Sequence, residues 1–382
     1  MQYLIFEHGY RGHRLEYLHH QYMYAGNYEL QNKFIFILHP GMKQRMELIN
    51  FPIFPNTEIE YIPEYTAKDI DAAFIVKKSW KLSKLLKQYI DRLNPDIVIV
   101  DELMAFMPSL PLIIRKQNLL RGIIYRIPRR RNNGILKKII YNTIFKLFAK
   151  SNIFERIWIL NDSTSCSHYN LMYKTKKFKF LPDPINIDNF SNKKVKSIKD
   201  QFNGRIIFLH AGGLGERKGT FCIVDAIKLM KPEERQKCAF IFAGSIVNSD
   251  ERNKMLQFIQ NNNQDNSIYY SDEFIRFDLF LNYFTIADYV LIPYSNSEQS
   301  SGILGYSAYF KKKVIGPNNG LLGEIINKYN LGYTIQSINP KNLKEIIVSI
   351  ITDKHQEANN HLSDVYASIC TVDKFTHTIF AN

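Results

Sequence analysis

The residues best suited to chemistry lie in a glycine-rich segment, 211–219, that ends in an adjacent arginine and lysine. Gly212 and Gly213 leave backbone amides open to a ligand. Arg217 and Lys218 bring two cations to the same place, just before an expected helix whose first amides attract anions. The glycine spacing is neither that of a P-loop nor that of a GxGxxG loop. The segment predicts a diphosphate site, although a plain turn would explain the glycines alone.

A second segment, 293–306 (PYSNSEQSSGILGY), carries a lone carboxylate ahead of an expected helix. Glu298 can accept hydrogen bonds from sugar hydroxyls, and the amides of Ser301, Gly302 and Ile303 at the start of the helix can bind a phosphate. A carboxylate that only complements the start of the helix is the plainer interpretation of Glu298.

The first half of the chain offers candidates after two expected strands. Gly12 allows a close backbone approach, and His13 opens a helix, where it either enters a ligand site or caps and packs the helix. Asp101 and Glu102 follow the strand expected at 96–100 and can orient or deprotonate an acceptor hydroxyl. A hydrolase built on this carboxylate pair is disfavoured, because neighbouring residues on a strand point to opposite faces.

Each of these segments follows a short buried strand in a chain where strands and helices alternate. In the first half we expect strands at 2–7, 33–38, 58–62, 96–100, 156–160 and 178–181, and helices at 13–25, 68–93 and 135–150. In the second half we expect strands at 206–213, 239–245, 267–272, 288–294, 313–317 and 332–336, with helices between them and a long helical stretch after 341.

The alternation predicts an α/β protein with two doubly wound, Rossmann-like domains that face each other across a cleft. Ligands of such sheets bind beyond the carboxyl ends of the strands. We expect an acceptor-side domain over 1–190, a donor-binding domain over 191–365 and a C-terminal helix within 366–382 that packs back on the first domain.

Composition excludes several classes of protein. The chain has 382 residues, 45% of them hydrophobic, which is enough for two cores and excludes general disorder. The four cysteines lack disulfide or zinc-site spacing, which is typical of a reducing compartment. No basic leader and no run of eighteen uncharged apolar residues occur, so we expect a cytoplasmic protein.

The net charge of +14 is concentrated in the first half of the chain. Residues 1–190 hold 28 Lys and Arg against 17 Asp and Glu, whereas residues 191–382 hold 22 against 19. Residues 103–154 contain eleven basic side chains and no acidic one.

Segment 135–150 reads as an amphipathic basic helix, with Leu136 and Ile140 on its apolar face. At about 1 kcal/mol per cation near an anionic leaflet, residues 115–150 predict reversible membrane association. The plainer interpretation is a core helix with a solvated polar face. Nucleic acid is disfavoured as a partner, because no helix-turn-helix, zinc-finger or RNP signature is present.

Over roughly 180–335 the chain resembles retaining glycosyltransferases of the GT-B fold, in particular glycosyltransferase family 4. Five segments carry the resemblance in order. They are LPDPINIDNF (181–190), FLHAGGLGERKG (208–219), FIFAGS (240–245), ADYVLIPYSNSEQSSGILGYSA (287–308) and VIGPNNGLLGEII (314–326). The first half matches only in its architecture and in its glycine-rich first loop with a histidine.

The resemblance implies roles for individual residues of the donor site. Lys218 corresponds to the family's lysine on the donor diphosphate, and Glu298 to the first signature glutamate, which contacts the donor sugar. Gly244 falls on the glycine after the second strand of this domain, and Glu324 on the later Gly-x-x-Glu position, where it would equally cap a helix.

Two positions depart from the family pattern. Gly213 stands where the family commonly has an arginine, and Arg217 is then the candidate for the missing cation. Tyr306 stands where the family has the second glutamate, usually assigned to the nucleotide ribose, so the nucleotide contacts differ or the enzyme is weakened.

The resemblance implies a hexosyltransferase that uses a nucleotide-diphosphate sugar, with retention and without a metal or other cofactor. The acceptor would be a glycan or a lipid-linked molecule at the inner face of the cell membrane, in cell-surface polysaccharide or glycoconjugate synthesis. Two alternatives stay open: a nucleotide-sugar epimerase of similar architecture, and a catalytically silent glycosyltransferase-like partner, which Tyr306 motivates.

Overall fold

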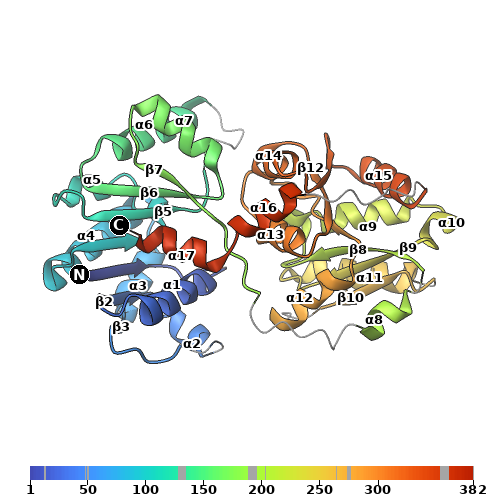
Figure 1. Cartoon of the computed structure of the whole chain (residues 1–382), viewed down its shortest axis with the longest axis horizontal. Coiled ribbons are helices and arrows are strands. Elements are labelled where there is room, and N and C mark those ends of the chain that lie inside the picture. The colour runs from blue at the N-terminus through green and yellow to red at the C-terminus, as the bar shows by residue number, and fades with distance from the viewer. Residues whose placement is uncertain are drawn as a thin grey trace. The chain divides into compact units, whose positions relative to one another are not determined.

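A computed structural model describes residues 1–12, 14–47, 49, 51–127, 135–187, 196–202, 204–263, 265–272, 277–352 and 361–381. The chain forms two compact units, which are named here unit 1 (Met1–Pro182 and Val372–Asn382) and unit 2 (Asp183–Thr371) (Figure 1).

Unit 1 is built on a seven-stranded sheet in the order β3-β2-β1-β4-β5-β6-β7, in which every neighbouring pair is parallel. The strands are β1 (Gln2–Glu7), β2 (Lys33–Leu38), β3 (Thr57–Tyr61), β4 (Ile97–Val100), β5 (Leu120–Ile124), β6 (Phe154–Leu160) and β7 (Phe178–Leu181). The helices are α1 (Arg14–Tyr28), α2 (Met42–Met46), α3 (Glu64–Asp71), α4 (Ile75–Leu93), η1 (Leu103–Phe106), α5 (Leu110–Ile113), α6 (Ile135–Lys150), α7 (Ser163–Tyr173) and α17 (Val372–Phe380).

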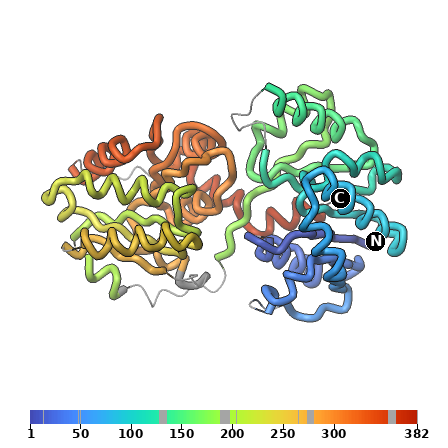
Figure 2. The backbone as a smooth tube through the Cα atoms, turned by 180° about the vertical axis from the view of Figure 1, so that it is seen from behind, coloured from blue at the N-terminus to red at the C-terminus, as the bar shows by residue number. Residues whose placement is uncertain are grey.

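Both faces of this sheet are buried, as its continuously apolar strands require. Along β1, Leu4 and Phe6 join the cluster with α4 and α7, whereas Tyr3 and Ile5 join the cluster with α1 and α17. Two views show α17 beside the first strand and first helix of the chain (Figures 1 and 2). The last residues of the chain therefore complete the core of its first unit.

Unit 2 repeats the plan with a six-stranded parallel sheet in the order β10-β9-β8-β11-β12-β13. The strands are β8 (Ile206–Ala211), β9 (Cys238–Ala243), β10 (Ile268–Ser271), β11 (Tyr289–Leu291), β12 (Lys313–Pro317) and β13 (Gly332–Ile335). The helices are α8 (Lys196–Gln201), η3 (Glu216–Lys218), α9 (Thr220–Lys228), α10 (Pro232–Arg235), α11 (Ser249–Asn262), α12 (Phe277–Ile286), α13 (Gly302–Tyr309), α14 (Gly320–Lys328), α15 (Pro340–Thr352) and α16 (His361–Ile369).

The strand order reverses once in each unit. The reversal lies between β1 and β4 in unit 1, and between β8 and β11 in unit 2. Connections leave the two strands in opposite directions at such a point, so their carboxyl ends leave room for a ligand. The loops after these four strands are therefore where the fold favours binding.

The expected fold class, two doubly wound Rossmann-like domains, is confirmed. The sequence placed domain ends at 190 and 365, whereas the compact units divide after Pro182 and Thr371. The reason is local, because residues just after Pro182 bond to unit 2: Ser300 Oγ donates to Asp183 at 2.6 Å, and Ile185 N–H donates to the carbonyl of Cys370.

Several elements differ from those expected. The strand β5 and the helix α7 were not predicted, and the helix expected at 68–93 is two helices, α3 and α4, which an exposed turn separates. Within the described residues, no helix is both long enough and apolar enough to cross a bilayer.

Candidate functional site

The glycine-rich loop of unit 2 follows β8 and is held by close backbone contacts. A Cβ on Gly244, where φ is +146°, would lie 1.8 Å from the carbonyl oxygen of Gly212. A Cβ on Gly219, where φ is +74°, would lie 1.9 Å from the carbonyl oxygen of Pro293. Glycine is therefore required at both positions, and the loop is tied to β9 on one side and to the segment after β11 on the other.

A buried histidine fixes the base of this loop. The His210 ring lies between the Leu291 carbonyl, 2.8 Å from Nδ1, and the Thr220 hydroxyl, 2.9 Å from Nε2. Since the carbonyl only accepts, Nδ1 carries the proton, and Thr220 donates to Nε2. The Thr220 oxygen in turn accepts the amide of Gly215 at 2.8 Å. Burial lowers the pKa of His210 to about 4, so the ring is neutral and this chain of hydrogen bonds is fixed.

The loop and the segment after β11 come together around Lys218. The Lys218 ammonium lies 3.9 Å from the centre of the Tyr294 ring, and the Tyr294 hydroxyl lies 3.4 Å from Ser301 Oγ at the start of α13. Ser295 Oγ donates to the carbonyl of Arg217 at 3.1 Å. The cationic end of the loop therefore lies on the same segment that leads into the α13 amides.

The remaining donor-side candidates are distributed around this arrangement. Gly213 is exposed, and a Cβ added there would have no described atom within 4 Å, while Gly302 begins α13. Glu298 is partly buried, and its amide donates to Asn296 Oδ1 at 3.2 Å. Glu324 is exposed on the second turn of α14.

Tyr306 lies in the hydrophobic core of unit 2. Its ring contacts those of Phe280 and Phe284, and its hydroxyl accepts the backbone amide of Asn186 at 3.3 Å. The Tyr306 hydroxyl therefore holds the segment that enters unit 2.

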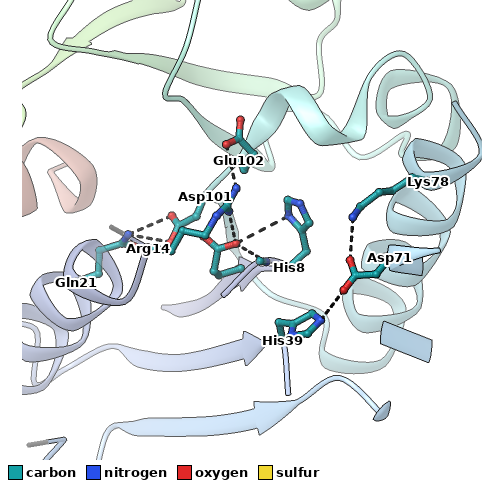
Figure 3. Close-up of polar contacts among 10 residues, drawn as sticks. His8, Arg14, Gln21, His39, Asp71, Lys78, Asp101 and Glu102 are labelled. Atoms are coloured by element: carbon teal, nitrogen blue, oxygen red, sulfur yellow. Dashed lines mark hydrogen bonds and ion pairs between the residues drawn. The ribbon is translucent and has the colours of Figure 1, made fainter. Parts of the chain in front are cut away.

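The carboxyl edge of the unit 1 sheet carries a buried cluster of three acids around one guanidinium (Figure 3). Arg14 on α1 pairs with Glu7 at the end of β1, at 2.5 Å, and with Glu102 after β4, at 3.1 Å. The Gly9 amide donates to the same Glu7 oxygen at 2.7 Å. A single cation thus serves two carboxylates at the point where the strand order reverses.

Asp101 and Glu102, which the sequence proposed together, take different positions. Asp101 is 1% exposed, and both of its oxygens accept from the Gln21 amide, at 3.0 and 3.1 Å. The Glu102 side chain keeps 19% of its surface. Only Glu102 of the two is therefore open to a ligand.

Burial governs the titration of this cluster. It raises the pKa of Glu7 to about 8 and that of Asp101 to about 7, and it raises the pKa of Glu102 as well. Arg14 lowers all three values, but desolvation is the larger effect. The other Glu7 oxygen, Oε2, and the Tyr125 hydroxyl are buried without a hydrogen-bond partner in the described part of the chain.

The loop between β1 and α1 is held by α2 and by the residue after β2. Arg45 on α2 donates to the carbonyls of Tyr10 and Gly12, and the Tyr10 ring stacks on His39, just after β2, at 4.6 Å. His39 also contacts Asp71 at the end of α3, at 3.2 Å. Gly12 thus belongs to an ordered turn, whereas His13 lies outside the described residues.

The basic segment 115–150 is only partly exposed to solvent. Arg121 is buried in β5, where it pairs with Glu155 at 2.7 Å and donates to the carbonyl of Ile379, so it is not available to a membrane. Residues 129–131 lie outside the described residues.

In α6 the buried side chains are Phe145, Phe148 and Ala149, whereas Leu136 and Ile140 of the expected apolar face are exposed. The plainer expectation, a core helix with a solvated polar face, therefore holds only for the second half of α6. Over the described ranges, no group of three His, Cys, Asp or Glu side chains is arranged to hold a metal.

Several site residues were not found from the sequence. Glu7, Arg14 and Gln21 belong to segments that read as a strand and a helix, and His210 and Thr220 flank a loop that was recognised by its glycines and its two cations. The signal that could have pointed to Glu7 is a carboxyl side chain on the last residue of a buried strand.

Comparison with known proteins places the chain among glycosyltransferases in fold. Residues 191–364 match the family model described as glycosyl transferases group 1. Similar solved structures include HepE of Anabaena in complex with UDP (14% identity, TM-score 0.69, covering 99% of this chain and 98% of that one). Others are a glycosyltransferase from Rickettsia africae (15%, 0.70, 99% and 96%) and WaaG, a glycosyltransferase involved in lipopolysaccharide biosynthesis (12%, 0.66, 100% and 100%).

The solved structures confirm the GT-B fold expected from the sequence, and residues 191–364 confirm the expected resemblance to group 1 glycosyl transferases. Membership of family 4 in particular is not confirmed by these matches. No curated protein sequence matches the chain.

Proposed function

Because residues 191–364 match the group 1 glycosyl transferases, we propose that the chain transfers a hexosyl group from a nucleotide-diphosphate sugar to an acceptor. The observation that carries the proposal is the contact of Lys218 with Tyr294, whose hydroxyl reaches Ser301. It joins the cationic loop to the start of α13, so a diphosphate bound there would meet a lysine and helix amides together.

The reaction needs stabilisation of the departing phosphate. As the bond between the anomeric carbon and the phosphate oxygen breaks, its electron pair moves to the nucleoside diphosphate. Lys218, Arg217 and the amides of residues 301–303 are the groups that would stabilise this charge without a metal. Glu298 would hold hydroxyls of the donor sugar.

For the acceptor we propose attack from the face that the phosphate leaves, which gives retention. The acceptor oxygen forms the new bond to the anomeric carbon, and its proton passes to the departing phosphate. Glu102 is better suited than Asp101 to orient the acceptor hydroxyl. Gln21 encloses Asp101, whereas Arg14 holds Glu102 at the exposed edge of the cluster.

A uridine nucleotide is the first donor to test. HepE, which shares the fold, was solved with UDP and with UDP-glucose. WaaG acts in lipopolysaccharide biosynthesis, which motivates a lipid-linked or glycan acceptor and synthesis of surface polysaccharide at the inner face of the cell membrane.

Membrane association through residues 115–150 is part of the proposal. Ile135, Leu136, Ile139 and Ile140 are exposed on the first turns of α6, with Lys137 and Lys138 among them. Apolar side chains beside lysines suit the surface of an anionic leaflet. Binding to anionic vesicles that weakens with salt, and with Lys137→Glu/Lys138→Glu, would support this; binding insensitive to salt would contradict it.

The test begins with thermal shifts for a panel of nucleoside diphosphates and their sugars. A true donor stabilises the protein in proportion to its concentration over its dissociation constant. The stabilising sugar nucleotide is then supplied in labelled form, with and without a membrane extract as acceptor and with and without a chelator.

Three outcomes distinguish the functions considered. Label in a glycan or lipid identifies a transferase, and activity that survives the chelator supports metal independence. Interconversion of the free sugar nucleotide would identify an epimerase instead. Tight binding without turnover, with Glu298→Ala silent in cells, would identify a catalytically silent partner.

A further inference from the structure

The turn between α3 and α4 exposes a run of apolar side chains, at a position where a helix start usually carries a polar cap. Phe74 is 90% exposed and Ile75 is 84% exposed, and Val76 follows them, also exposed. Phe74 is the N-cap residue of α4 and makes no side-chain capping bond. Since Ser, Thr, Asp or Asn would stabilise the helix at this position, Phe74 lowers the stability of the helix start and gains no burial in return.

The surroundings of this run, named here the α3–α4 corner (residues 64–84), are aromatic and basic. Tyr65 and Trp80 are exposed beside it. The acidic side chains of α3 each pair with a lysine, in the pairs Glu64–Lys68, Asp69–Lys81 and Asp71–Lys78. The further lysines Lys77 and Lys84 are exposed and leave the corner with an excess of positive charge.

We propose that the α3–α4 corner inserts Phe74, Ile75 and Val76 into the surface of an anionic lipid bilayer. Trp80 and Tyr65 then lie at the boundary between the headgroups and the acyl chains, where amphipathic rings are enriched, and the lysines contact lipid phosphates. The composition favours a bilayer over a protein partner, because lysine is depleted in protein interfaces but enriched on membrane-bound surfaces.

The α3–α4 corner is separate in sequence from α6 and lies beside the cluster of acidic side chains around Arg14. Asp71, the last residue of α3, contacts both His39 and Lys78, and Figure 3 shows these three next to His8. One consequence rests on the proposed function. The acceptor would be a molecule whose polar end reaches Glu102 while its apolar part stays in the bilayer.

The experiment uses Trp80 as its own reporter. The chain has two tryptophans, and Trp158 is buried in β6, so it gives a constant background. The full chain is mixed with phosphatidylcholine vesicles, with and without phosphatidylglycerol, and with lipids brominated in the acyl chain. We expect Trp80 emission to shift to shorter wavelength and to be quenched by bromine on anionic vesicles only.

Variants separate this corner from other exposed apolar residues. Phe74→Ser/Ile75→Ser should weaken vesicle binding about tenfold, because it removes most of the inserted apolar surface. Leu171→Ser on α7, where the leucine is 84% exposed, and Val247→Ser in unit 2 should bind as the wild type does. Thermal unfolding of each variant checks that it is folded.

Three results would overturn the inference: no bromine quenching of Trp80, equal binding by Phe74→Ser/Ile75→Ser and the wild type, or loss of binding only with Lys137→Glu/Lys138→Glu. The measurement needs no donor and no turnover. A chain that binds vesicles through this corner but transfers no sugar therefore contradicts the proposed transfer alone, and a transferase whose vesicle binding is unchanged by Phe74→Ser/Ile75→Ser contradicts the anchor alone.

Discussion

In the proposed donor site, Lys218 is held in place by an aromatic ring. The face of Tyr294 attracts the ammonium but does not neutralise it, so the positive charge stays available to a ligand. Packing against the ring also restricts a long side chain before any ligand arrives, which reduces the entropy lost on binding.

Replacing Lys218 with alanine should lower kcat for glycosyl transfer by about 10²- to 10³-fold, because one charge that stabilises the leaving phosphate is removed. Steady-state kinetics with the identified donor measure the effect. The matched control is Lys254→Ala, since Lys254 lies over the Phe221 ring at 4.3 Å in the same unit. Equal losses in the two variants would contradict a specific role for Lys218.

Glu7 makes the stability of unit 1 depend on pH. Burial raises its pKa from the usual 4.5 to about 8, so between these values the folded chain keeps a proton that the unfolded chain has lost. The unfolded state then binds fewer protons, and stability falls as pH rises through this window. Asp101, with a pKa raised to about 7, acts in the same direction.

Glu7→Gln should therefore reduce the loss of Tm between pH 5 and pH 8, because glutamine keeps an acceptor for Gly9 and Arg14 but does not titrate. Calorimetry or fluorescence melts across this range measure it. Glu47→Gln, at an exposed position after α2, should leave the slope of the wild type unchanged. A steeper slope in Glu7→Gln would show that the buried carboxyl is ionised throughout.

At the scale of secondary-structure elements, the sequence predicted strands that are continuous apolar runs. It missed the strand whose buried charge is paired with residues distant in sequence. Continuous apolar runs predicted β1, β2, β8 and β9 closely. The strand β5 was missed because Arg121 interrupts its short apolar run. The guanidinium is tolerated there through Glu155 and through the carbonyls of Ile379 and Ala381, which are distant in sequence.

The candidate site follows the same division. The sequence predicted a site at the glycines and cations of the loop after β8, because these residues are adjacent in the chain. It did not predict the cluster of Glu7, Arg14 and Glu102, because α1 and the strand order bring these three residues together. The family pattern placed Tyr306 in the donor site, but an aromatic ring at that position packs with Phe280 and Phe284.

The glycine-rich loop offers a matched pair of backbone tests. Gly244→Ala should destabilise unit 2 by about 2 kcal/mol or more and abolish donor binding, because its Cβ would overlap the Gly212 carbonyl at a φ that L-residues avoid. Gly213→Ala should be tolerated, since no described atom lies within 4 Å of where its Cβ would be. Thermal shift with the donor nucleotide measures both, and normal binding by Gly244→Ala would contradict the tight approach.

At the scale of the whole molecule, the two units share one structural plan. Each has a parallel sheet covered on both faces, and each places its polar loops where the strand order reverses. The chain crosses between units twice, at Pro182 and Thr371, so unit 1 takes its last helix from the end of the sequence. Each unit has its own core, which makes their stabilities separable.

Phe375→Ala tests this separation. Phe375 on α17 is fully buried in unit 1 against Tyr17, and its removal should cost unit 1 about 3–5 kcal/mol. Scanning calorimetry should then show a lowered transition for unit 1, while the transition of unit 2, which the proposed donor nucleotide would raise, keeps its midpoint. Ile347→Ala, in the core of unit 2, should do the reverse and lower the transition of unit 2. If both substitutions shift one common transition equally, the units unfold as a single body, and α17 couples the two cores instead of serving unit 1 alone.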